Sequence, residues 1–177
     1  DSGHMLPPFW LRRLVEPVAS GNARVTTSYH HVLPGDHGVA TQGRALSVLF
    51  LHFMQLVPFL CQPWGGSTAI LRSVFDELGV RDTWNRTVVD DVSLASLLDK
   101  ARIRVTAVPA ADSTTPLAGE TAATWSAWLT RQLMYLKLFY PATWVLGGLA
   151  GLFVVSSLVM LMGCAVLALA GAADRTT

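Results

Sequence analysis

Three short segments carry residue types that could do chemistry on a ligand. Asp1-Ser2-Gly3 places a carboxylate beside two small residues, which is typical of a tight loop. Gly65 and Gly66 permit close approach of the backbone to a ligand, and Asp90-Asp91 is a carboxylate pair directly before a Leu-rich segment. Carboxylates hold divalent cations and accept protons. We therefore interpret Asp1 as the start of a metal and phosphate site.

Each segment also has a purely structural explanation. Asp-Ser-Gly is common in turns, and Gly-Gly is common before a strand. Asp90 and Asp91 could cap the helix that follows them, because a carboxylate satisfies free N–H groups in a first helical turn. Taken singly, none of the three segments distinguishes a ligand site from ordinary turn and cap chemistry.

The elements that would position these segments follow from periodicity and turn residues. Apolar residues recur at helical spacing in "FWLRRLVEPVA" (residues 9–19), which predicts a helix after the first segment. "ARVTTSYH" (residues 23–30) predicts a strand, and "HVLPGDHG" (residues 31–38) predicts a turn-rich loop. The Gly-Gly turn leads to a short strand and to a helix that ends with Gly79 in the C′ position. "IRVTAV" (residues 103–108) predicts a further strand.

Three histidines and two cysteines are candidate metal or redox residues. The spacing of His30, His31 and His37 matches no pattern in which four ligands close a zinc site, so we expect solvated loop histidines. One of them could still lie near an acceptor. Cys61 and Cys164 stand in apolar surroundings, which favours buried, inert thiols over a disulfide.

Composition indicates a membrane protein. Only 14% of the 177 residues are charged, against a usual share of about 25%, and the net charge of +1 argues against nucleic-acid binding by bulk electrostatics. No charged residue occurs from Leu138 to Ala173, and residues 142–172 are long enough to span a bilayer, which takes about 20 apolar residues. Arg131 and Lys137 before this segment and Arg175 after it favour a cytoplasmic location for the preceding part.

Two further segments are predicted to lie at the membrane surface. "ALSVLFLHFMQLVPFLC" (residues 45–61) is too short for a span and is interrupted by His52, Gln55 and Pro58, so we expect an interfacial or re-entrant helix. "TWSAWLTRQLMYLKLFYP" (residues 124–141) predicts an amphipathic helix that ends at its proline. Its aromatic residues suit the level of the lipid headgroups.

In order along the chain, these motifs resemble the ceramide glucosyltransferase-like branch of the family-2 glycosyltransferases. The resemblance runs from Asp1 to about Pro141. "DSGHMLPPFWLRRLVEPV" is similar to the second acidic motif and the helix behind it, and "GGSTAILRS" (residues 65–73) to the Gly-rich acceptor-side segment. "VDDVSLASLL" (residues 89–98) is similar to the third acidic motif, where the family more often has Glu-Asp. "RQLMY" (residues 131–135) takes the place of the family's (Gln/Arg)-x-x-Arg-Trp.

The resemblance implies a fold and a reaction. The fold would be α/β, the C-terminal half of a GT-A-type (Rossmann-like) catalytic domain over residues 1–140. The N-terminal nucleotide-binding part would precede it, a transmembrane helix would cover residues 141–173, and residues 174–177 would form a tail. The reaction would transfer a hexose, glucose from UDP-glucose in the first instance, to a lipid hydroxyl such as that of ceramide, with inversion. The partners would be a UDP-sugar, a lipid acceptor and the membrane, with no nucleic acid, and the catalytic part would face the cytoplasm of a bacterial inner membrane.

The resemblance also implies roles for single residues. Asp91 would be the general base, with Asp90 beside it in the catalytic pair, and Asp1 would hold Mg²⁺ or Mn²⁺ against the donor diphosphate. The donor-binding residues would be Asp1, Ser2, Gly3, Arg131, Gln132, Tyr135 and Lys137, and the acceptor-side residues would be Gly65, Gly66 and Ser67.

The fourth motif departs from the family. Met134 replaces its arginine and Tyr135 its tryptophan, so Lys137 could supply the missing cation, or Gln132 could be the motif's polar residue. A processive polysaccharide synthase, which keeps the tryptophan, is one alternative function. A non-catalytic membrane anchor that binds lipid or a partner helix is the other, with Gly147, Gly151 and Gly163 available for helix packing.

Overall fold

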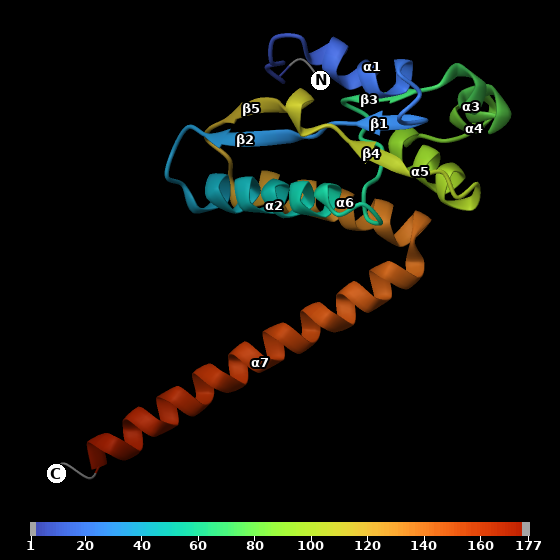
Figure 1. Ribbon diagram of the computed structural model, residues 1–177. Helices are drawn as coiled ribbons and strands as arrows, with labels where there is room; N and C mark the ends of the chain where they lie inside the picture. Colours follow the sequence, from blue (N-terminus) through green and yellow to red (C-terminus); the bar gives the residue numbers. More distant parts are fainter. Residues whose placement is uncertain (1–2, 175–177) are drawn as a thin grey trace. The chain divides into compact units, whose positions relative to one another are not determined.

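The chain divides into two compact units, Asp1–Thr130 and Arg131–Thr177, in the computed structural model, which describes residues 3–174. The first unit is mixed α/β, with short strands and several helices (Figure 1). The second consists of the end of one helix and a long apolar helix. The α/β class and the apolar C-terminal helix agree with the prediction from sequence.

The strands of the first unit form two small sheets. β1 (Val25–Thr27) lies between β3 (Thr68–Ile70), which is antiparallel to it, and β4 (Val105–Ala107), which is parallel. β2 (His30–Pro34) pairs in parallel with β5 (Ser113–Leu117). The single strand predicted over residues 23–30 is therefore two strands, separated at Ser28 and Tyr29.

The prediction of a loop over residues 31–38 was wrong for residues 31–34. His31 to Pro34 belong to β2, and Thr114 of β5 stands opposite His31 in the register. A partner strand about eighty residues away supplies the backbone hydrogen bonds that a local turn signal cannot anticipate. The turn begins only at Gly35.

The helices of the first unit are α1 (Trp10–Ala19), α2 (Val39–Leu56), α3 (Arg72–Glu77), α4 (Val80–Trp84), α5 (Asp90–Lys100) and the first part of α6 (Ala122–Phe139), with a short 3₁₀ turn, η1 (Pro109–Ala111). They include those predicted from sequence, with different bounds for α2, and α4, which was not predicted. Gly79 follows α3 with φ 59°, a left-handed conformation that glycine adopts without strain, so the C′ prediction is confirmed. In α1, Leu14 and Val18 are buried, whereas Leu11 from the same predicted apolar stripe is exposed.

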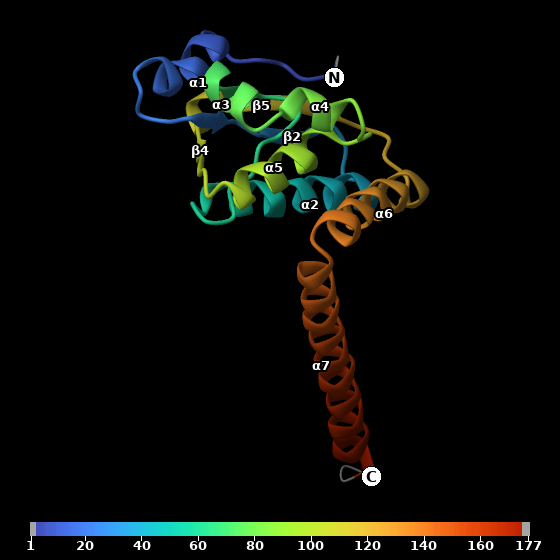
Figure 2. The same ribbon diagram turned by 90° about the vertical axis from the view of Figure 1, so that its right-hand side faces the viewer.

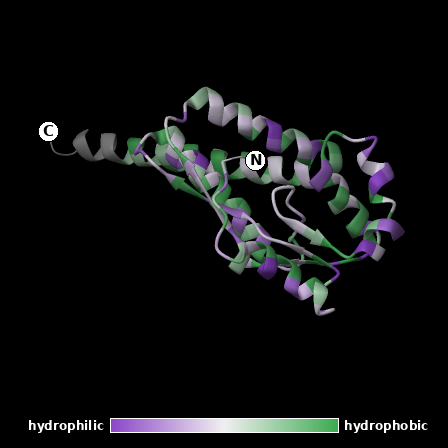
Figure 3. Cartoon of the chain, turned by 90° about the horizontal axis from the view of Figure 1, so that it is seen from above, coloured by the Kyte–Doolittle hydropathy of each residue, from purple (hydrophilic) through white to green (hydrophobic). Residues whose placement is uncertain are grey.

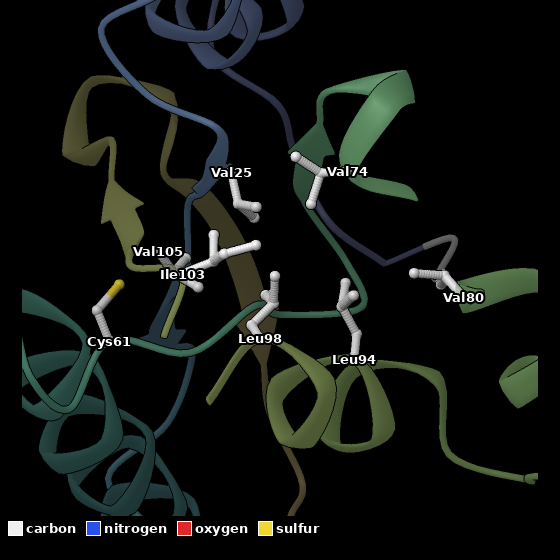
Figure 4. Packing of buried hydrophobic residues seen from close by; sticks show 8 residues of the cluster. All are labelled: Val25, Cys61, Val74, Val80, Leu94, Leu98, Ile103 and Val105. Atoms are coloured by element: carbon white, nitrogen blue, oxygen red, sulfur yellow. The ribbon is translucent and has the colours of Figure 1, made fainter. Parts of the chain in front are cut away.

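The hydrophobic core lies between the three-stranded sheet and the helices α3, α4 and α5 (Figure 4). Its buried members are Val25, Cys61, Val74, Val80, Leu94, Leu98, Ile103 and Val105. Full burial of one such aliphatic side chain contributes about 1.5–3 kcal/mol. Burial also raises the pKa of the Cys61 thiol to about 11, so this cysteine is uncharged at neutral pH and unreactive, as predicted. The prediction of a buried thiol was wrong for Cys164, which is exposed on the apolar C-terminal helix.

Helix α2 lies along β2 and presents three different faces (Figures 1 and 2). One face carries the buried residues Thr41, Val48 and His52. A second face meets α6, where the Trp125 ring occupies the space that a side chain at Gly43 would need. The third face exposes large apolar side chains, namely Leu46, Leu49, Phe50, Phe53 and Leu56. A helix was predicted for residues 45–61; it starts earlier and ends at Leu56, before Pro58.

The second unit contains the long helix α7 (Pro141–Asp174). Its stretch Pro141–Ala168, 28 residues, is long and apolar enough to cross a membrane, and apolar side chains are exposed along it. Hydrophilic residues, by contrast, are distributed over the helices and loops of the first unit (Figure 3). Just before α7, the Lys137 ammonium lies 5.3 Å from the centre of the Trp144 ring. The membrane orientation stays a prediction.

Candidate functional site

The acidic pair and the Gly-Gly turn meet at the N-terminal end of α5. Asp91 Oδ2 accepts a hydrogen bond of 3.3 Å from the Gly65 amide, and Asp91 Oδ1 accepts one of 2.7 Å from the Val92 amide. The Trp84 indole donates to the Asp90 carbonyl at 3.0 Å and holds this end of the helix in place. Two motifs that sequence analysis singled out separately thus form one site.

Helix capping accounts for only part of this arrangement. Asp90 Oδ1 accepts from the Asp91 amide at 2.8 Å, so both carboxylates do serve first-turn amides. The N-cap residue itself, however, is Val89, which has no side-chain cap. The contact of Asp91 with Gly65 reaches outside the helix, and a cap does not require it.

The electrostatic surroundings make Asp91 a stronger base than an ordinary aspartate. Burial raises the pKa of its carboxyl, the Gly65 and Val92 amides oppose that rise, and the charge of Asp90 adds to it. A carboxylate with a raised pKa gains driving force for taking a proton.

The neighbours of the turn require glycine at position 66 and leave little room at position 65. A side chain at Gly66 would overlap the Trp64 ring, and a Cβ at Gly65 would lie 3.2 Å from Asp90 Oδ1. Ser67 is buried, and its hydroxyl accepts from the Trp10 indole at 2.9 Å and bonds Ser28 at 2.6 Å. The Ser67 side chain therefore holds the turn against α1 and the end of β1. Contact of this turn with an acceptor stays a prediction.

An aromatic cluster that sequence analysis missed borders the turn. The Trp64 ring stacks on His30 with 5.0 Å between ring centres and 6° between planes. His4 packs edge-on against both rings, and Tyr29 contacts both at an angle. Burial, then the nearby Asp91 charge, raises the pKa of Tyr29 to about 12. The one hint in the sequence was a tryptophan immediately before Gly-Gly.

His30 is predicted to make folding stability sensitive to acid. Burial, with the charges of His4, Arg44, His31 and His52, lowers its pKa to about 4. The unfolded chain, with a histidine pKa of about 6.5, then binds more protons than the folded one, so stability is lost as pH falls from about 6.5 towards 4. Because the ring is partly solvent-exposed, we expect a loss of about 1–2 kcal/mol, to be measured by denaturant unfolding at pH 7 and pH 5.

His30→Gln should flatten this pH dependence. His37→Gln is the matched control, because His37 is exposed on the loop before α2 and lies outside the cluster. Equal pH slopes for the two variants would contradict the assignment.

A second cluster joins His31, His52 and Asp112. Their ligand atoms all lie within 4.8 Å of one another, and His31 Nε2 is 3.5 Å from Asp112 Oδ2. The expectation of solvated loop histidines is therefore wrong for His30 and His31, which lie on β2 against buried neighbours. It holds for His37. His52 and Asp112 were not predicted as partners of His31, because they are distant from β2 along the chain.

Apart from Gly3, the predicted donor residues lie in the second unit or outside the described residues. Asp1 and Ser2 lie outside the described residues, and Gly3 is an exposed turn residue. The other four, Arg131, Gln132, Tyr135 and Lys137, are on the last part of α6, in the second unit. Their roles, and that of Mg²⁺ or Mn²⁺, stay predictions.

The functional assignment of this chain depends on the geometry described above, because the comparisons with known proteins found no relative. No protein-family model matches the chain, and a search of curated proteins found no match.

Proposed function

We propose that the chain is the acceptor-side part of a membrane-bound glycosyltransferase with a GT-A-type fold, similar to the ceramide glucosyltransferase-like branch of family 2. The observation that carries the proposal is the hydrogen bond between the Gly65 amide and Asp91. The resemblance implies that these two motifs face one acceptor. The two motifs meet at the Asp91 carboxylate, whose pKa is raised, and this supports a shared acceptor site.

The proposed reaction is a single in-line displacement. Asp91 takes the proton of the acceptor hydroxyl as that oxygen bonds to the anomeric carbon of the sugar. The bond from that carbon to the donor phosphate breaks, and the nucleoside diphosphate leaves with the electron pair, which inverts the configuration. A divalent cation, when bound, would neutralise charge on the departing diphosphate, and Asp1 is the residue proposed to hold it.

Chain residues near the base have distinct roles in this proposal. The Gly65 and Val92 amides orient the Asp91 carboxylate, and the charge of Asp90 helps to keep its pKa raised. Trp64 and Tyr29 exclude water from one side of the site.

A lipid acceptor is supported by the outer face of α2. Phe50 and Phe53 are 62% and 55% exposed there, and the three leucines beside them extend the same stripe. A helix that is apolar on both its packed and its open face suits burial in protein or contact with lipid. The same chain also carries α7, a helix that is long and apolar enough to cross a membrane, which supports a protein that works at a bilayer.

The test is sugar transfer by the full-length protein in liposomes. Radiolabelled UDP-glucose and ceramide are supplied, and we expect a labelled glycolipid and free UDP in equal amounts. A labelled polymer without glycolipid would favour the processive synthase. No transfer from any UDP-hexose to any lipid hydroxyl, by protein that is folded and inserted, would favour the non-catalytic anchor.

A further inference from the structure

We propose that His31, His52 and Asp112 form a binding site for Zn²⁺, with a solvent molecule completing its coordination. The site is distinct from the Asp91 carboxylate and from the Mg²⁺ or Mn²⁺ expected at Asp1. It stands on the geometry of the first unit and does not depend on the proposed glycosyl transfer.

The distances suit a single small cation. His31 Nε2 and His52 Nε2 lie 3.5 and 3.7 Å from the same oxygen, Asp112 Oδ2. Tetrahedral zinc, with bonds of about 2.0–2.2 Å to nitrogen and oxygen, requires ligand atoms about 3.3 Å apart. An ion between the three atoms needs only small side-chain shifts.

A strand, a helix and a connecting residue hold the three ligands. His31 is on β2, His52 is on α2, and Asp112 lies between η1 and β5, directly before the residue that pairs with His30. Asp112 Oδ1 accepts a hydrogen bond of 2.8 Å from the Tyr29 amide. That bond orients the carboxylate so that Oδ2 faces both imidazoles, as the outer partners of metal ligands commonly do.

Burial and access also suit a metal with one open position. The side chains of His52 and Asp112 are each 8% exposed, whereas that of His31 is 44% exposed. A hollow of about 130 Å³ lies beside His31, lined also by Val32, Gln42 and Leu46. Solvent can therefore reach the cluster on the His31 side, as in sites with three protein ligands and a water.

The types and positions of the three ligands favour zinc. The ring centres of His31 and His52 lie 4.4 Å apart, and the Nε2 atoms of both rings lie near the same oxygen, Asp112 Oδ2. The buried His52 ring also packs against Tyr29, with 6.0 Å between ring centres. Two imidazoles and one carboxylate favour zinc over magnesium or calcium, which prefer oxygen ligands.

The test is metal binding by the full-length protein without a histidine tag, in detergent. After chelation, the protein is titrated with Zn²⁺ by calorimetry and with Co²⁺ by visible absorption, which reports tetrahedral coordination. We expect one ion per chain. Asp112→Asn and His31→Gln should each weaken Zn²⁺ binding by at least about 100-fold, given that loss of an outer-shell partner alone costs about 10–100-fold.

The variants are chosen to keep the fold. Asparagine at position 112 still accepts the Tyr29 amide, and His31 is on the open side of the cluster, so melting temperatures in chelator should stay close to that of the parent. His37→Gln, which removes an exposed histidine outside the cluster, should bind Zn²⁺ as the parent does. Zn²⁺ binding that is absent in the parent, or equal in the parent and the Asp112→Asn variant, would overturn the proposal whatever the sugar-transfer result.

Discussion

Asp91→Asn is expected to reduce sugar transfer by about 10²–10⁴-fold, the usual effect of losing a general base. Asparagine has nearly the same size, and its oxygen still accepts the Gly65 or the Val92 amide, but it cannot take the acceptor proton. The melting temperature should not fall, because burial raises the pKa of Asp91 and the substitution removes a charge that the site disfavours. Loss of a helix cap, in contrast, would cost about 0.5–2 kcal/mol of stability.

The measurement is single-turnover transfer at saturating donor, with Asp90→Asn as the matched control. Asp90 is exposed and its carboxylate accepts the Asp91 amide of its own helix, so its replacement should affect the chemical step less. The parent should also lose activity on acidification at a pH above the ordinary titration range of aspartate, because Asp91 must be ionised to act and its pKa is raised. Transfer by Asp91→Asn within a few-fold of the parent would place the base elsewhere.

Glu120→Gln is expected to destabilise the first unit by about 3 kcal/mol, because it breaks a largely buried ion pair and leaves the cation behind. Arg44 donates to Glu120 at 3.1 Å, with the two side chains only 21% and 10% exposed. The Arg44 guanidinium also lies 4.1 Å from the centre of the Trp128 ring. These contacts join α2 to the segment that begins α6, so their loss should loosen both helices.

Glu77→Gln is the control for that prediction. Glu77 pairs with Arg24 at a similar distance, 3.2 Å, but the side chains are 65% and 51% exposed. Solvent screening limits such a pair to less than about 1 kcal/mol. Denaturant unfolding of both variants measures the difference, and equal losses would show that burial does not strengthen the Arg44–Glu120 pair.

The sequence by itself determined the elements whose signals are local. The uncharged run became the long apolar helix α7, the helical spacing after Pro8 became α1, and Gly79 ended α3 as expected. Each depends on residues within a few turns of one another, where periodicity and backbone preference decide the outcome. The sequence also marked Gly65 and Asp91 as important, each in its own segment.

Only the tertiary structure decided which residues meet. β2 forms because β5 pairs with it, and that pairing brings His31 to Asp112 while α2 delivers His52. Trp64 and His30 stack because tertiary packing also brings the Gly-Gly turn next to strand β2. No local pattern encodes such contacts, because they arise from the free energy of pairing and burying segments far apart in the chain.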